Sequence, residues 1–324
     1  MTHSADGFGL VVNPNAGRVH RRYLARRPFW GDLLPEDRVR VTRDSGDLAA
    51  AIAEFRAAGV GVIGCLGGDG TVHRLVEAVI AEYGAAGAPV LAPLAGGTMN
   101  GLPRALGCGG PPERRLADCV EASARAVIPA RPHPMLRVTD HRSERQRYGF
   151  TFGAGLIYRM DEDYYRRARP GVAAAVWDSS LPVRRALLGR AFAPDLGMDL
   201  RVEDETWLAE RPHSVAAAVV ENPFLWFRPF GSEPRKPETF RLSANAMSPR
   251  EMAPRLWRIY RGRCRHERLR IGQVRAASMR GTTGYVLDGD PYPGPLDVDL
   301  EPGPSLRFID FEPPVALRRP RHDR

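Results

Sequence analysis

Short apolar segments alternate with helical repeats through the first third of the chain. Four runs rich in Val, Ile and Leu close at Gly, Asn or Pro, as buried strands do, over residues 9–13, 39–42, 60–66 and 89–94. Between them, the apolar residues of 48–55 and 72–80 recur three and four positions apart, the spacing of one helix face. Strand and helix in alternation predict an α/β domain with a parallel sheet and flanking helices.

The pattern changes after about residue 131. Short, partly alternating apolar segments separated by turn residues predict a mostly β, sandwich-like domain. Two segments with helical spacing, 161–192 and 249–262, interrupt it. The predicted domains are therefore 1–130 and 131–304, and segment 305–324 could pack back onto the first. The expected strands of the second domain are 148–153, 198–202, 214–220, 269–274 and 284–287.

Length and composition agree with two globular domains. A chain of 324 residues can bury two cores, and no apolar run approaches the ~20 residues that a membrane-spanning helix needs. The polar segment 1–7 does not predict a secretory signal. The cysteines form no CxxC pair and have no histidine at metal-ligand spacing, so buried thiols in a reducing cytosol are expected rather than zinc or disulfides. They are Cys65, Cys108, Cys119 and Cys264.

The net charge is +9, and Lys236 is the only lysine. A P-loop is excluded, because its lysine must follow a GxxxxG turn. The positive balance favours anionic partners: nucleic acid, an acidic membrane surface or phosphorylated molecules. Charge alone does not choose among them.

The most specific motif is Gly67-Gly68-Asp69-Gly70-Thr71, between an expected strand and an amphipathic helix. Glycines let the main chain turn tightly and approach a bound group, and a helix N-terminus offers free N–H groups to phosphate. Thr71 can cap the helix. A glycine turn also joins strands to helices without binding anything, but the aspartate and the flanking elements favour phosphate binding.

Two further turns follow expected strands. Ala95-Gly96-Gly97-Thr98-Met99-Asn100 follows the strand after the first motif, and Asn13-Pro14-Asn15-Ala16-Gly17 ends the first strand. The carboxyl ends of parallel strands share one edge of a sheet, where open parallel sheets bind ligands. Each turn alone is a weak indication of ligand binding, and the three turns together predict one polar edge of the sheet.

NPNAG, GGDGT and GGTMN, in this order and spacing, resemble the nucleotide-binding half of the diacylglycerol kinase and sphingosine kinase family, relatives of NAD kinase. The resemblance continues to Asn222, to a helix around Leu256 and Ile259, and to the YVLDGD segment ending at Asp290, which is similar to the family's DGE segment. It covers nearly the whole chain. It implies an ATP-dependent lipid kinase with an NAD kinase-like nucleotide-binding domain over 1–130 and a lipid-substrate domain over 131–304.

The resemblance also implies roles for single residues. ATP would lie between the domains, with its phosphates over the GGDGT loop and Mg²⁺ nearby. Asp288 would be the general base, with Asp69 organising Mg²⁺ and the transferring phosphoryl group, or the two roles reversed. Asp290 joins Asp69 as an expected metal residue. Without the resemblance, Asp288-Gly289-Asp290 is a plain hairpin turn. The expected nucleotide site comprises Asn13, Thr42, Gly67, Gly68, Asp69, Gly70, Thr71, Gly97, Thr98 and Asn100.

Three departures from the family pattern bear on the site. Gly101 follows Asn100 where the family often has aspartate, and Asp290 stands for glutamate. A bulky Pro-Phe-Leu-Trp-Phe run replaces the glycines expected after Asn222. The arrangement of metal and substrate at these places is left open.

The first helical segment of the second domain carries many arginines. A solvated helix face is the default interpretation, and a basic amphipathic surface that docks on anionic lipid is the functional one. The expected partners are a lipid substrate and an anionic membrane surface, with no nucleic acid, and a homodimer is left open. The expected location is cytoplasmic and peripheral to the membrane. The arginines are Arg166, Arg167, Arg169, Arg184, Arg185 and Arg190, beside Tyr164, Tyr165, Val172 and Trp177.

Two other functions compete with a lipid kinase. NAD kinases share GGDGT but usually carry NxGxLGFL at the second loop, where this chain has GGTMNGL. A nucleotide-binding protein without turnover is compatible with the missing loop carboxylate at Gly101. The identity of the acceptor cannot be read from the sequence.

Overall fold

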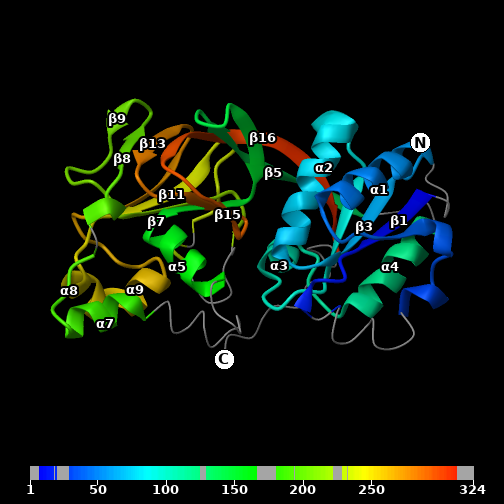
Figure 1. Ribbon diagram of the computed structural model, residues 1–324, viewed down its shortest axis with the longest axis horizontal. Helices are drawn as coiled ribbons and strands as arrows, with labels where there is room; N and C mark the ends of the chain where they lie inside the picture. Colours follow the sequence, from blue (N-terminus) through cyan, green and yellow to red (C-terminus); the bar gives the residue numbers. More distant parts are fainter. Residues whose placement is uncertain are drawn as a thin grey trace. The chain divides into compact units, whose positions relative to one another are not determined.

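The computed structural model describes residues 7–17, 19, 29–124, 129–165, 180–192, 194–221, 228–231 and 233–311. Two compact units divide the chain, one from Met1–His133 with Leu306–Arg324 and one from Pro134–Ser305. The first is α/β with parallel strands, and the second is mostly β (Figure 1). The predicted fold class is confirmed.

The first unit is built on parallel strands in the order β2-β1-β3-β4. Every residue of β1, β3 and β4 is buried, as expected for strands covered by helices on both faces. The strands are β1 (Phe8–Val12), β2 (Val39–Val41), β3 (Val62–Gly67) and β4 (Val90–Ala95). The helices that flank them are α1 (Ser45–Ala57), α2 (Asp69–Gly87), α3 (Gly101–Ala105) and α4 (Pro112–Ala124), with 3-10 turns η3 (Phe29–Asp32) and η4 (Glu36–Arg38) (Figure 1).

Local signals position α1. The Asp44 carboxylate accepts a hydrogen bond from the Asp47 N–H at 2.8 Å, which caps the helix. Ile52 and Phe55 then point into the core. The Phe55 ring lies 2.8 Å from where a Cβ at Gly9 would stand, so the helix packs on β1 only because that position is glycine.

The second unit contains a six-stranded antiparallel sheet in the order β12-β11-β10-β7-β14-β15. Its apolar residues include the fully buried Phe152, Phe240 and Leu242. The strands are β7 (Thr151–Gly155), β10 (Ser214–Ala218), β11 (Phe240–Asn245), β12 (Leu269–Val274), β14 (Tyr285–Leu287) and β15 (Asp290–Tyr292).

The other strands of the second unit pair around β16, which also reaches the first unit. β16 pairs antiparallel with β13, and at its far end Phe308 pairs parallel with Leu91 of β4. β5 pairs with β16 and β6, and β8 pairs with β13 and β9. The bounds are β5 (Ala130–Asp140), β6 (Arg145–Gly149), β8 (Asp199–Val202), β9 (Glu205–Thr206), β13 (Ala277–Gly281) and β16 (Leu296–Ile309).

Three predicted elements differ from the structure. The strand expected over 148–153 is two strands, β6 and β7, because the Phe150 N–H bonds the Asp288 carboxylate at 2.9 Å. The described part of the first helical segment contains α5 (Leu156–Tyr165), which begins earlier than residue 161, and α7 (Leu181–Leu187), followed by the 3-10 turn η5 (Pro194–Leu196). Segment 249–262 contains α8 (Pro249–Met252), η6 (Ala253–Arg255) and α9 (Leu256–Tyr260), since Pro254 interrupts a continuous helix.

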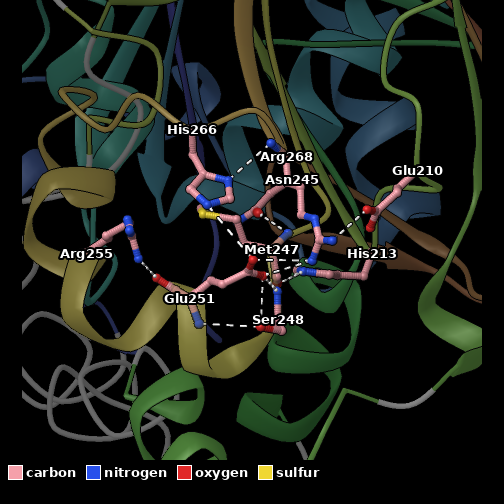
Figure 2. A network of polar contacts seen from close by, with 9 residues as sticks. All are labelled: Glu210, His213, Asn245, Met247, Ser248, Glu251, Arg255, His266 and Arg268. Carbon is pink, nitrogen blue, oxygen red and sulfur yellow. Dashed lines mark hydrogen bonds and ion pairs between the residues drawn. The ribbon is translucent and has the colours of Figure 1, made fainter.

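A polar network ties α8 to the sheet (Figure 2). Ser248 and Glu251 form a capping box at the start of α8, with the Ser248 N–H donating to Glu251 at 2.8 Å. Arg268 binds Glu251 at 3.2 Å and Glu210 at 2.9 Å. His213, whose pKa burial lowers, contacts the Met247 carbonyl oxygen at 2.7 Å through Nε2. The capping box fixes where α8 begins.

Candidate functional site

Strand register brings the predicted turns of the first unit to one edge. Val12 pairs with Val41 on one side and with Leu66 on the other, and Gly67 pairs with Ala95. The residues that follow these positions are the polar turn residues of the sequence. The carboxyl edge of the parallel sheet therefore collects all three turns, as the motif order predicts.

The two glycine loops touch main chain to main chain. A Cβ at Gly97 would lie 2.5 Å from Gly68 Cα, which no side chain can accept. The Gly96 N–H donates to the Gly67 carbonyl oxygen at 2.8 Å, and a Cβ at Gly67 would lie 2.5 Å from Thr71 Cβ. Glycine is required at these positions by close packing rather than by a positive φ.

Thr71 links the first two turns. Its Oγ1 accepts from Asn13 Nδ2 at 2.8 Å and from the Gly68 N–H at 3.3 Å. The helix N-cap is Gly68, and Thr71 stands three residues later and bonds back to it. The predicted capping role is thus played from the third helical position.

Asp69 and Asn100 organise the second loop. Asp69, the first residue of α2, accepts a hydrogen bond from the Leu102 N–H of α3 at 2.8 Å through Oδ1. Asn100 is 1% exposed, has φ of 52°, and bonds both the N–H and the carbonyl oxygen of Gly97 at 2.8 Å. The buried Asn100 side chain therefore stabilises the second loop through its two hydrogen bonds to Gly97.

The remaining predicted nucleotide residues differ in exposure. Thr98 is exposed at the tip of the second loop. Thr42 is buried, and its N–H donates to the Val12 carbonyl oxygen at 2.9 Å. Gly68 and Gly70 are half-buried at the first turn of α2, where the helix presents its N–H groups and the positive end of its dipole. This edge has the chemistry of a phosphate site.

Asp288 belongs to the second unit and is 3% exposed. It sits in the two-residue turn between β14 and β15 with φ of 53°, followed by Gly289 with φ of 88°. Its carboxylate accepts from the Phe150 N–H at 2.9 Å, and from the Thr151 N–H at 2.8 Å and hydroxyl at 3.0 Å. A Cβ at Gly149 would lie 2.7 Å from Asp288 Oδ2, so glycine makes room for the carboxylate. The segment 288–290 is thus a hairpin turn, as its sequence alone suggests, and the turn also holds the hydrogen-bonded Asp288 carboxylate.

Asp290, two residues later, is half-buried at the start of β15. Burial raises the pKa of Asp161 on α5 to about 7, and the negative charge of Asp290 contributes a smaller part of this increase. Asp161 Oδ2 is buried without a hydrogen-bond partner. Asp161 therefore keeps its proton to a higher pH than an ordinary aspartate does, beside Asp290.

Asp161 was missed by sequence reasoning, although the sequence holds one signal. It follows the buried Tyr158 by three positions, which places both on one face of α5. A carboxylate on the core face of a helix is unusual and marks a perturbed environment. The pattern does not tell which charge lies opposite.

The described residues contain no group of three or more His, Cys, Asp or Glu side chains that could hold a metal ion. Mg²⁺ in kinases is commonly bound by one or two carboxylates together with the substrate's phosphates. Asp69 in the first unit and Asp290 in the second are single carboxylates of that kind. Neither belongs to a cage built by the described side chains alone.

The four thiols lie in the interior of the protein. All four cysteines are buried, as the sequence predicts. Burial raises the pKa of Cys65 to about 12, which removes its thiolate at neutral pH.

Some predicted residues lie outside the described part of the chain. These are Asn222, with the run 223–227 after it, and Arg166, Arg167, Arg169, Val172 and Trp177. Arg184, Arg185 and Arg190 are described, on and just after α7. No helix in the described ranges combines the length and apolar character needed to cross a membrane.

The chain is similar to known proteins in its first part and in its fold. The family model of the diacylglycerol kinase catalytic domain matches residues 8–130. A crystal structure named a diacylglycerol kinase from Bacillus anthracis strain Sterne is 14% identical, with a TM-score of 0.61, over 94% of this chain and 96% of that one. A second from the same organism, provisionally given the same name, is 15% identical, with a TM-score of 0.67, over 94% and 96%.

None of the curated proteins matches the chain. At these identities the solved structures establish the fold alone. The sequence match and the geometry of the glycine loops agree over the same residues. The chain carries, over residues 8–130, a domain of the diacylglycerol kinase catalytic family.

Proposed function

We propose that the chain transfers the terminal phosphoryl group of ATP to a hydroxyl of a lipid or lipid-like alcohol. One observation carries the proposal: the GGDGT turn and the second glycine loop pack main chain to main chain beside the N-terminus of α2. Such an edge binds phosphate through N–H groups and the helix dipole. Within the matched family domain, that ligand is the triphosphate of a nucleotide.

The loop residues would act by position. Thr71, held by Asn13 and Gly68, keeps the first turn of α2 open toward the phosphates. Asp69 anchors α3 through Leu102, so a phosphate bound at the first loop would also fix the second. Positioning and charge neutralisation are the main demands of phosphoryl transfer. Bound magnesium would supply the neutralisation, with one of the two predicted carboxylates, Asp69 or Asp290, as its ligand.

The proton of the acceptor hydroxyl needs a carboxylate that can reach it. Asp288, with its oxygens bound by Phe150 and Thr151, is poorly placed to leave those bonds for a substrate. Asp290 is more exposed and lies beside Asp161, a carboxyl group whose pKa is raised. We therefore propose that Asp288 holds the turn and that whichever of Asp69 and Asp290 does not bind the magnesium accepts the proton.

A test uses the full chain, labelled ATP, Mg²⁺ and fractionated lipids, with product identification by mass. A phosphorylated long-chain alcohol supports the proposal. Label in NADP⁺ when NAD⁺ is supplied would favour an NAD kinase instead. A rise in melting temperature with ATP and no labelled product would identify a nucleotide-binding protein without turnover.

A further inference from the structure

Large apolar side chains are exposed on the short helices of the second unit. Leu187 is 82% exposed, Leu188 66% and Trp257 65%. In the described part of the chain, only Val41 is a further exposed large apolar residue, at 42%. Apolar exposure is thus concentrated at the end of α7 and on α9, which is unusual for a surface facing water alone.

These helices form one group. α7 contacts α8 and η6, and η6 contacts α9, and all lie together at the lower left of Figure 1. Met252 and Ile259 are buried in the cluster beneath them. Trp257, two positions before Ile259, consequently faces outward.

The same helices carry a one-sided charge. Residues 180–192 and 248–265 contain nine arginines and one acidic residue, Glu251. The Glu251 carboxylate is already bound by Ser248 and Arg268 (Figure 2), so it leaves this charge uncompensated. The exposed arginines form no ion pair with any other residue that the structure describes; they are Arg190, Arg250, Arg258, Arg261, Arg263 and Arg265.

Arginine and aromatic groups are also paired directly. The Arg261 guanidinium lies 4.3 Å from the centre of the Trp257 ring. An indole with a cation over its face suits the boundary between headgroups and acyl chains, where tryptophan is enriched.

We propose that Leu187, Leu188 and Trp257, with Arg190, Arg258 and Arg261, form a docking surface for an anionic phospholipid membrane. The inference rests on the proposed function, in which the acceptor is a lipid. The leucines and the tryptophan enter the acyl boundary, and the arginines lie at the lipid phosphates. Nucleic acid would bind the arginines but leave both leucines in water. A second copy would bring like charges together.

The test is cosedimentation of the full chain, without ATP, with vesicles of phosphatidylcholine alone or with phosphatidylglycerol added. We expect binding only to the anionic vesicles. Arg190→Gln/Arg258→Gln/Arg261→Gln should lower the partition coefficient about tenfold or more, and Leu187→Ser/Leu188→Ser/Trp257→Ser should do the same. The matched control is Arg142→Gln/Arg201→Gln/Arg275→Gln, which changes the net charge equally at exposed sites elsewhere in the unit and should bind as the wild type does.

Several results would overturn the docking surface. Equal binding to neutral vesicles, or equal losses in the control and the arginine variant, would remove it. So would Leu187→Ser/Leu188→Ser/Trp257→Ser changing only self-association in sedimentation velocity, since the surface would then join two copies. If Arg190→Gln/Arg258→Gln/Arg261→Gln lost binding to a DNA duplex but kept its binding to vesicles, the surface would be assigned to nucleic acid.

The proposed kinase function is separated by its own readout. Nucleotide binding, followed by the rise in melting temperature with ATP and Mg²⁺, should be the same in every variant. Vesicle binding through this surface without phosphoryl transfer to any lipid would retain the surface and remove the function. Phosphorylation of a short-chain, water-soluble diacylglycerol, with vesicle binding unaffected by the variants, would do the reverse.

Discussion

At the scale of single residues, two aspartates in one turn have different surroundings. Asp288 is buried and accepts three main-chain or hydroxyl donors from Phe150 and Thr151. Asp290 is half-buried and faces the charge of Asp161. The Asp288 carboxylate is bound by the backbone, whereas the Asp290 side chain is more open to solvent.

Replacing Asp288 should therefore affect stability first. Asp288→Asn turns one acceptor into an NH₂ group facing main-chain donors, at a cost of about 2 to 3 kcal/mol in the free energy of unfolding. Urea denaturation measures it. Asp290→Asn is the comparison, with a small change in stability and a large loss of phosphoryl transfer. A folded, fully stable Asp288→Asn protein without activity would instead assign the base role to Asp288.

Asp161 predicts a dependence of stability on pH. Its pKa is raised in the folded state, so the folded chain holds a proton that the unfolded chain releases between about pH 4 and pH 7. The burial of this group is least unfavourable at low pH, and its destabilising effect is complete above pH 7. Asp161→Asn should thus stabilise the chain at pH 8, relative to pH 5, by on the order of 3 kcal/mol.

Thermal unfolding of wild type and variant at both pH values measures this difference. Asp163→Asn, an exposed position on the same helix, is the control and should change little at either pH. An Asp161→Asn protein that gains nothing at pH 8 would mean that the carboxyl group ionises normally.

At the scale of elements, the site depends on how closely two loops approach. The first follows β3 and the second follows β4, and neighbouring parallel strands place them side by side. Main-chain contact between Gly68 and Gly97 then keeps both loops at the start of α2. The two glycine loops and the positive end of the α2 dipole therefore meet at the start of α2.

Gly97→Ala tests this contact. The added Cβ would stand 2.5 Å from Gly68 Cα, and main chain cannot move aside as a flexible side chain can. We expect a loss of stability of about 1 to 3 kcal/mol and loss of the ATP-dependent rise in melting temperature. Gly87→Ala, where nothing lies within 4 Å of the new Cβ, should keep both. Normal ATP stabilisation of Gly97→Ala would place the nucleotide elsewhere.

At the scale of the whole molecule, the two units are joined through a strand that serves both. β16 pairs with β13 in the second unit, and near its C-terminal end, at Phe308, it pairs with β4 in the first. Phe308 is fully buried. The Arg131 and Asp310 side chains form an ion pair that ties the neighbouring ends. The first unit is therefore completed by a segment that begins at Leu306, 173 positions after His133 (306 − 133).

Phe308→Ala should destabilise the first unit selectively. Truncating a buried phenylalanine costs about 3 to 5 kcal/mol. Hydrogen exchange should speed up in β3 and β4 and stay slow in β10 and β11. Arg307→Ala, exposed on the same strand, is the control. Uniform loss of protection in both units would show that they unfold as one.

The sequence by itself determined the alternation of strand and helix, the three turns and their order. Apolar runs and glycine turns are local signals, so β1 to β4 were predicted to within two residues at each end, and the glycine motif marked the turn between β3 and α2. Asp69, Asn13 and Thr71 could be named in advance because the motif orders them along the chain. The hydrogen bonds that these residues form depend on how neighbouring strands pair, and only the structure shows them.

Only the tertiary structure decided what depends on distant partners. The split of segment 148–153 into two strands follows from a carboxylate 138 positions away in sequence. The raised pKa of Asp161 depends on burial and on Asp290, and the pairing of β16 with β4 depends on sheet assembly. Burial, electrostatics and pairing act through space, and a pattern read along the chain carries no distance.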